Sequence, residues 1–318
     1  MTLIALLIAL ALEWIAESLG ELRRRTCFSC LVERVRNWPL FGRQPTVADL
    51  FLLLVVVGAT AVLAAVLESW LFGIPGLLFS VFVLFWCLHP RHMHPHLDAY
   101  LVARAGHDDN AARHEAQILL DEPIPVDTEE EVRKVADSVL VGGLTEVFAV
   151  LFWFVLLGPA GAVLYRFLWQ VVHRPPEPGG EASGEAATDG QDFLPRAPLA
   201  PGWRARVLAL LEWLPARLMA ALFLVVGAYE KGVRAWQAAS AFSVDPGQDR
   251  WLAGTRQLLR DVGRGAIEAE AQVVCARDSN DCLVTRAGLV ASARAVVFRA
   301  LVAGIALAAI ATLAGWLG

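Results

Sequence analysis

Long apolar segments alternate with charged ones along the whole chain. A helix needs ~20 apolar residues to span a bilayer, and candidate segments lie at 1–19, 47–70, 77–88 with a start near Phe72, 139–172, 206–229 and 295–317. The charged segments between them contain proline breaks, such as Pro123 and Pro125, and an acid-rich helix start at Asp127–Glu131. Both features are typical of helices outside the bilayer. The pattern predicts an all-α polytopic membrane protein with about six transmembrane helices, and five to seven fit it as well. Two helical stretches are expected in the cytoplasm.

The same pattern divides the chain into segments. We expect three transmembrane helices within 1–90, with a basic loop at 20–46 after the first of them. The other divisions are a first cytoplasmic helical stretch at 91–138, a long kinked transmembrane helix at 139–172, a disordered acidic linker at 173–203, a transmembrane helix at 204–229, a second cytoplasmic helical stretch at 230–294 and a C-terminal transmembrane helix at 295–318. The linker is rich in Pro, Gly, Glu, Ala and Ser and has no apolar period, which predicts disorder.

The segment 139–172 is long for a single span, and the dipeptide Gly158-Pro159 interrupts it. It fits either one kinked span or two short ones. Lys and Arg are enriched in cytoplasmic loops, and here they gather in the loop 20–46 and in the two helical stretches, whereas the linker is acidic. One span places all three basic segments in the cytoplasm, with the linker and both termini outside. The charge pattern therefore favours one span.

Composition supports a membrane protein. Hydrophobic residues make up 57% of the 318 residues, and the mean hydropathy is +0.52. The net charge is −5 and the arginines are dispersed, so nucleic-acid binding is not expected. The five cysteines are an odd number, which does not fit a disulfide framework.

Charged residues within the apolar segments mark a candidate ligand site. Glu212 and Arg217 flank a proline, and a charge near the bilayer centre costs ~2.5–3.5 kcal/mol on insertion scales. These side chains either enter a polar bundle interior or lie at the interface and reach water. Proline has no N–H, so a nearby helix carbonyl loses its donor. Glu13 and Glu17 are four residues apart and share one helix face, which points at Arg217 or lies at the interface.

Two groups of side chains could bind a metal. They are the histidines His92, His94 and His96 of one extended loop, and the cysteines Cys27, Cys30, Cys275 and Cys282. Imidazole suits a transition metal and four thiolates suit zinc. The alternatives are histidines that satisfy local hydrogen bonds at the membrane surface, and unrelated buried thiols. We expect no bound metal and no cofactor, and the sequence has no Walker A element.

The stretch Leu211-Glu-Trp-Leu-Pro-Ala-Arg-Leu218, followed by an apolar run and Tyr229-Glu-Lys, resembles the AmpE family. The Met-Thr-Leu start, the segment His96–Leu101 and the apolar run Phe148–Gly158 resemble it too. AmpE proteins are inner-membrane proteins associated with control of induced β-lactamase. The resemblance therefore implies a multi-pass protein of the bacterial inner membrane that takes part in regulation.

AmpE proteins are distantly similar to the CobD/CbiB family of cobalamin biosynthesis, membrane enzymes that form an amide with ATP. Their Gly-Arg-Asp-Thr element corresponds to 120–125 here, which keeps neither the Arg nor the Thr. Of their acidic helix motif this chain keeps Asp137 and has Glu146 near the end, and two of their aspartates align with Leu208 and Ala209. The core Leu214-Pro-Ala-Arg-Leu218 is retained. The departures remove carboxylates that would bind Mg²⁺ and activate a phosphate.

We therefore expect a sensor or modulator without catalytic residues that binds an anionic ligand, a cell-wall fragment or a nucleotide, in a polar bundle interior. Residues expected at the ligand are Arg217, Glu212, Glu13, Glu17, Arg104, Asp98, Tyr100, Glu230 and Lys231. A protein partner on the cytoplasmic side and a homodimer fit this reading. The alternative is an ATP- and Mg²⁺-dependent amide-forming ligase of the CobD/CbiB type.

Overall fold

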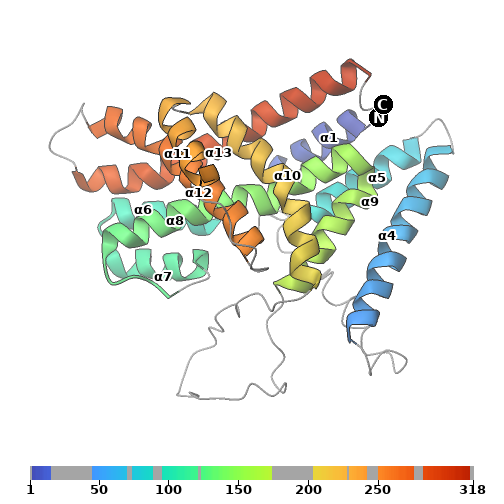
Figure 1. Ribbon diagram of the computed structural model, residues 1–318, viewed down its shortest axis with the longest axis horizontal. Coiled ribbons are helices and arrows are strands. Elements are labelled where there is room, and N and C mark those ends of the chain that lie inside the picture. The colour runs from blue at the N-terminus through green and yellow to red at the C-terminus, as the bar shows by residue number, and fades with distance from the viewer. Residues whose placement is uncertain are drawn as a thin grey trace.

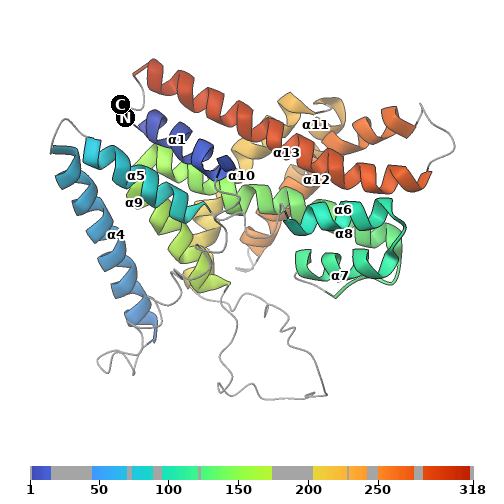
Figure 2. The same cartoon turned by 180° about the vertical axis from the view of Figure 1, so that it is seen from behind.

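Helices account for all the regular structure of the residues that the computed structural model describes: 2–15, 45–69, 74–88, 95–120, 123–173, 203–227, 229–241, 250–275 and 282–315. The elements are α1 (Thr2–Ile15), α4 (Pro45–Ser69), α5 (Ile74–Cys87), α6 (Pro95–Ala105), α7 (Asp109–Leu119), α8 (Thr128–Gly142), the π-helix η3 (Gly143–Phe148), α9 (Ala149–Val172), α10 (Trp203–Val226), α11 (Tyr229–Ala241), α12 (Arg250–Cys275) and α13 (Cys282–Leu313). Figures 1 and 2 show them from opposite sides.

Four helical segments of the described chain are long and apolar enough to cross a membrane: Phe51–Ser69, Thr128–Val172, Arg204–Val226 and Gly288–Leu313. The shorter apolar helix Ile74–Cys87 packs against two of them, through α4 and α9. On α4, large side chains such as Leu54 and Val62 are exposed, which suits a helix whose surroundings are lipid. These helices confirm the predicted all-α polytopic membrane protein.

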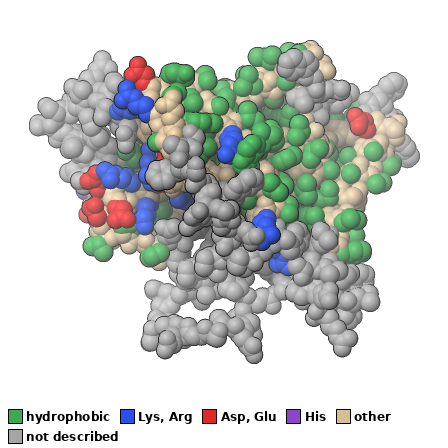
Figure 3. Space-filling model, in the orientation of Figure 1, with side chains coloured by type: hydrophobic (Ala, Val, Ile, Leu, Met, Phe, Trp, Pro, Cys, Tyr) green, Lys and Arg blue, Asp and Glu red, His purple; other side chains and the backbone are tan. Residues whose placement is uncertain are grey.

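Hydrophobic and charged side chains separate along the molecule. In Figure 3 hydrophobic side chains cover the part formed by α4, α9 and the C-terminal half of α13, and charged side chains gather at the opposite end, over α6, α7 and the start of α8. A bilayer accepts the first kind of surface and excludes the second. The end that carries α6 and α7 is therefore the part that extends into water.

The helical segment Thr128–Val172 is bent at Gly158, whose backbone has φ 68° and ψ −159°. Only glycine adopts this conformation readily, and Pro159 cannot continue the hydrogen bonding of the first arm. The second arm turns back on the first so closely that a Cβ at Gly161 would lie 2.4 Å from the carbonyl oxygen of Trp153. Figure 1 shows this arm descending beside α10. The segment thus consists of two helical arms, and the membrane side of the linker stays a prediction.

Helices α6, α7 and α8 form a capped layer at the charged end. Asp108 caps α7 by accepting a hydrogen bond from the backbone N–H of Ala111 at 3.0 Å. Asp127 caps α8 by accepting from the N–H of Glu129 at 3.2 Å. The acids of the first turn of α8 complement the positive end of the helix dipole. The predicted helix start at Asp127 is confirmed.

Helix α12 lies along α10 over much of its length, with α11 beside it (Figure 1). Arg256 contacts Glu212 near one end, and Gly227 near the other end is so close to α12 that a Cβ there would lie 2.5 Å from the Cβ of Ala266. The apolar residues between them are buried in one core cluster with α8 and α13. The second predicted cytoplasmic stretch is therefore packed against a membrane span.

Candidate functional site

Buried charged groups concentrate where these helices meet. The buried charged side chains of the described residues are Glu131, Asp137, Glu146, Arg166 and Glu212. A buried charge is costly unless a partner neutralises it. Three of the acids are paired with arginines, and two of these arginines come from α12.

Glu212 of α10 lies at the centre of a junction of three helices. Its side chain is 0% exposed, and its carboxylate accepts hydrogen bonds from Arg256 of α12, from Nε at 3.2 Å and from a terminal nitrogen at 3.1 Å. The hydroxyl of Tyr165 on α9 donates to the same carboxylate at 3.3 Å. The Arg256 guanidinium also approaches His173 Nε2 at 3.4 Å. Two parallel charge-assisted bonds hold this pair in one geometry.

Proline creates a second contact at this junction. In an α-helix the N–H of residue 215 would donate to the carbonyl of Leu211, and Pro215 has no N–H. The indole N–H of Trp153 on α9 donates to that carbonyl at 3.1 Å. The carbonyl that the sequence leaves without a donor therefore binds a side chain of another helix.

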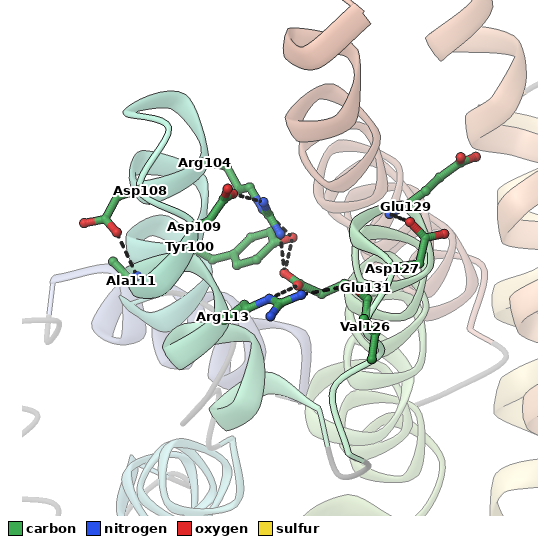
Figure 4. A network of polar contacts seen from close by, with 10 residues as sticks. All are labelled: Tyr100, Arg104, Asp108, Asp109, Ala111, Arg113, Val126, Asp127, Glu129 and Glu131. Carbon is green, nitrogen blue, oxygen red and sulfur yellow. Dashed lines mark hydrogen bonds and ion pairs between the residues drawn. The ribbon is translucent and has the colours of Figure 1, made fainter.

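Glu131 forms the second buried centre, at the start of α8 (Figure 4). Its Oε1 accepts from a terminal nitrogen of Arg104 at 2.5 Å and from the Tyr100 hydroxyl at 3.3 Å, while Arg113 Nε lies 3.7 Å from Oε2. Arg104 also donates to Asp109 at 2.7 Å. Burial raises the pKa of Tyr100, with Glu131 adding to the rise and Arg104 opposing it.

Burial alone would lower the pKa of Arg104, but the hydrogen bonds with Tyr100 and Glu131 outweigh it and raise that pKa. Arg104 therefore stays positively charged and can neutralise the buried carboxylate of Glu131. The centre joins α6 to the first turn of α8 through charge and not through apolar packing alone.

Two more pairs join the charged end to the last two helices. Arg264 of α12 donates to both carboxylate oxygens of Asp137 on α8, from Nε at 2.7 Å and from a terminal nitrogen. Arg294 of α13 donates to Asp98 of α6. The layer α6–α8 is thus linked by ion pairs to α12 and α13.

Glu212 and Arg217 do not meet. Five residues along a helix rotate a side chain by ~140° relative to the first, so Glu212 faces α12 and Arg217 faces away from it. The Arg217 guanidinium lies 4.1 Å from the ring centroid of Trp213, and the neighbouring Leu214 and Leu218 are exposed. The polar interior predicted for this stretch contains Glu212, whereas Arg217 lies at the helix surface.

The other predicted residues are spread over the molecule. Tyr100 and Arg104 lie together, Asp98 pairs with Arg294, and Glu230 is exposed at the start of α11 with Lys231 half-buried beside it. The side chain of Glu13, all of Glu17, residues 20–44 of the predicted loop and the linker 174–202 lie outside the described residues, whereas the last two residues of that loop begin α4. The predicted site residues are therefore not brought together as a set.

The candidate metal ligands are described only in part. His92 and His94, and the side chains of Cys27, Cys30, Cys275 and Cys282, lie outside the described residues. His96 is described, and its Nδ1 lies 2.8 Å from Glu115 Oε2. Within the described part of the chain no three His, Cys, Asp or Glu side chains are grouped closely enough to hold a metal ion.

Sequence reasoning missed the arginine partners on α12. Arg256, Arg260 and Arg264 are four residues apart and share one face. That spacing is visible in the sequence, but it is equally typical of a helix face exposed to water. Glu131 gave no signal, because it stands among the acids of a helix start.

The structure also shows whether the carboxylates that align with the acidic motif of CobD/CbiB are open to a metal ion. Asp137 is held by Arg264, and Glu146 is buried in the π-helix η3. Mg²⁺ needs carboxylate oxygens that are open to it, so a metal at Asp137 would have to displace the arginine. The residues present do not fit a preformed magnesium site there.

Comparisons with known proteins agree with the resemblance. The sequence model of a family described as "Regulatory signalling modulator protein AmpE" matches residues 1–172. This match ends before the stretch 211–218, although it includes the segment His96–Leu101. No solved structure matches the chain.

Three curated proteins are similar to parts of the chain. The chain is 30% identical to "Cobalamin biosynthesis protein CobD" of Stutzerimonas stutzeri over 65% of this chain and 64% of that protein. It is 37% identical to the CobD of Chromobacterium violaceum over 42% of this chain and 38% of that protein. It is 26% identical to "Protein AmpE" of Shigella flexneri over 58% of this chain and 62% of that protein. The chain thus spans less than two thirds of each relative's length. Since the AmpE family model matches more than half of the chain, this multi-pass membrane protein belongs to the AmpE family of regulatory proteins.

Proposed function

We propose that the protein is a regulator of the bacterial inner membrane that modulates β-lactamase induction by binding an anionic ligand, a cell-wall fragment or a nucleotide. Binding would be passed to a cytoplasmic protein partner through the layer α6–α8. The membership of the AmpE family supports the regulatory role. The ligand and the partner are inferred from charge and packing.

The observation that carries this proposal is the set of arginine–carboxylate pairs between α6–α8 or α10 and the last two helices. Glu212–Arg256, Asp137–Arg264 and Asp98–Arg294 each join two helices that are far apart in sequence. An anion that competes for one of these arginines would weaken a link between helices. Arginine suits such a ligand because its planar fork binds carboxylate and phosphate oxygens in pairs. A ligand can shift the helices only if it binds the two arrangements with different affinity.

The functional test uses a host with an inducible β-lactamase from which this chain has been deleted. Restoring the wild-type chain is expected to change the β-lactamase activity induced by a sub-inhibitory β-lactam. A variant with Asp98→Asn and Arg294→Gln, which removes one link on the exposed side, is expected to restore less of that change. Glu68→Gln removes an exposed acid of α4 that forms no ion pair with the described residues, and it serves as the matched surface variant. Equal induction with and without the wild-type chain would refute the regulatory role.

The ligand test distinguishes binding at Arg217 from binding at Arg104. Arg217→Ala is expected to weaken binding of an anhydromuropeptide or a nucleotide if the exposed face of α10 takes part, and Arg104→Gln if the α6–α8 layer does. Isothermal titration with each ligand on the purified protein would measure both. Unchanged affinity in both variants would remove these residues from the site.

A second candidate function is an ATP- and Mg²⁺-dependent amide-forming ligase, and the similarity to the CobD proteins is the observation that favours it. The Arg264 contact to Asp137 argues against it, because that acid is already neutralised. Magnesium-dependent release of ADP or AMP from ATP by the purified chain, in the presence of an amine and a carboxylic acid, would support the ligase. Absence of turnover under these conditions would favour the regulator.

A further inference from the structure

Three arginines form a row on one face of α12. Arg256, Arg260 and Arg264 are four residues apart, so their side chains lie one above another. The first binds Glu212 of α10, and the third binds Asp137 of α8. The two outer members of the row are therefore neutralised by acids from two different helices.

The middle member, Arg260, differs from both neighbours. Its Nε is buried and has no hydrogen-bond partner. Its side chain is only partly buried, so the rest of it can be reached from outside. None of the ion pairs of the described residues includes Arg260. Arg260 is thus a cation between two satisfied pairs, without an acid of its own.

The position of Arg260 makes a positive charge without a partner energetically costly. Helix α12 packs along α10, and α10 is one of the segments that can span the membrane. Arginine does not lose its proton in proteins, so it cannot escape the cost by becoming neutral. A half-buried cation beside a membrane span is expected to find an anion. Among the described residues, Glu212, Asp137 and Asp261 already have partners. We therefore expect that anion to come from another molecule.

We propose that Arg260 is the binding site for a phosphate group of another molecule, in the row between Arg256 and Arg264. Arg256 and Arg264 each have a carboxylate from another helix, and Asp261 lies 4.0 Å from Arg264, whereas Arg260 has no carboxylate partner among the described residues. One negative charge at Arg260 would complete the row. The planar fork of Arg260 would bind two phosphate oxygens. Two sources carry such a group: the headgroup of an anionic lipid and a soluble phosphorylated ligand. This site would be the place where the proposed regulator binds its ligand, and its role in regulation rests on the proposed function.

The test uses the full-length protein in nanodiscs. In discs of phosphatidylcholine alone, inorganic pyrophosphate is titrated by calorimetry. In discs that also contain phosphatidylglycerol, native mass spectrometry counts retained phosphatidylglycerol. The wild type is expected to bind one of the two probes, and Arg260→Gln to bind it about tenfold more weakly, as the loss of a charge-assisted bond implies. Pyrophosphate binding identifies a soluble ligand, and retained phosphatidylglycerol identifies a lipid headgroup.

The controls separate the site from general charge and from folding. Arg234→Gln removes an exposed arginine of α11 and is expected to leave binding unchanged. Arg260→Lys keeps the charge and should keep weakened binding even if Arg260→Gln folds poorly. The proposal is overturned if the wild type binds neither probe, or if Arg260→Gln and Arg260→Lys both bind as the wild type does.

The induction assay distinguishes this site from the proposed function. If Arg260→Gln loses phosphate binding but β-lactamase induction remains as in the wild type, Arg260 is a phosphate site that takes no part in regulation. If induction depends on the wild-type chain while neither probe binds, the regulatory function stands and the site fails.

Discussion

The indole N–H of Trp153 on α9 donates to the backbone carbonyl of Leu211 on α10, across 3.1 Å. Pro215 lies four residues after Leu211 and lacks the N–H that would otherwise occupy that carbonyl. The proline thus disrupts one bond within α10 and makes a bond between two helices available. Glu212, the next residue, turns to α12 and binds Arg256.

The first prediction tests this exchange of donors. Trp153→Phe is expected to lower the free energy of unfolding. The loss of the hydrogen-bond donor to the Leu211 carbonyl should contribute ~1–3 kcal/mol of this decrease. In a Pro215→Ala background the restored N–H bonds to Leu211, so the same replacement should cost less. Unfolding in a titration with denaturing detergent measures all four proteins. Equal losses in the two backgrounds would show that the indole contributes through its volume alone.

The second prediction concerns the buried pair of Glu212 and Arg256. Glu212→Gln is expected to lower the free energy of unfolding by about 3–5 kcal/mol, since the guanidinium loses its counter-charge in a buried place. The double variant Glu212→Gln, Arg256→Met should lose less than the sum of the single losses.

Glu230→Gln is the control for this pair, because Glu230 is exposed and its loss should change stability by no more than ~0.5 kcal/mol. The same detergent titration measures these proteins. Additive losses would mean that the two charges do not interact.

The third prediction follows from the pKa of Tyr100, which burial raises above its ordinary value of ~10. A raised pKa in the folded state gives stability that is fully present below the unfolded pKa and is lost as the pH rises through the folded pKa. Between about pH 10 and 11.5 the wild type should therefore lose stability more steeply than Tyr100→Phe, by up to ~1.4 kcal/mol per pH unit.

Unfolding of both proteins across pH 8 to 11.5, a range chosen around the ordinary tyrosine pKa of ~10, measures the two slopes. Below about pH 9, Tyr100→Phe should be less stable by ~1 kcal/mol, because Glu131 and Arg104 lose a hydrogen-bond partner. Parallel curves throughout would contradict the raised pKa.

The fourth prediction concerns the bend at Gly158. Gly158→Ala is expected to destabilise the protein by ~1–3 kcal/mol, because its φ of 68° with ψ −159° is unfavourable for any residue with a Cβ. No neighbouring atom lies within 4 Å of that Cβ, so the cost is conformational. Gly58→Ala in α4 is the matched control. It also meets no atom within 4 Å, and it should be neutral or stabilising by up to ~1 kcal/mol. Equal effects of the two replacements would show that the backbone relaxes at Gly158.

Much of the fold could be read from the sequence, since the positions of the helices follow from local pattern. The apolar runs at 47–70, 139–172, 206–229 and 295–317 overlap the four described helical segments that are long and apolar enough to cross a membrane. The acids after Asp127 marked the start of α8, and Gly158-Pro159 marked the bend. The direction of the second arm could not be read, because it depends on the backbone angles of one glycine. The packing of α12 along α10 was also missed, since its arginines suggested a helix in water.

The site was predicted least well, because it depends on which face each side chain occupies. The sequence by itself determined that Glu212 and Pro215 lie within an apolar helix, where a charge and a free carbonyl each need a partner. Only the tertiary structure decided that these partners are Arg256 and Trp153, from segments distant in the chain. A local pattern sets the need for a partner, and packing across helices sets its identity, because the distance between two side chains depends on every bend between them.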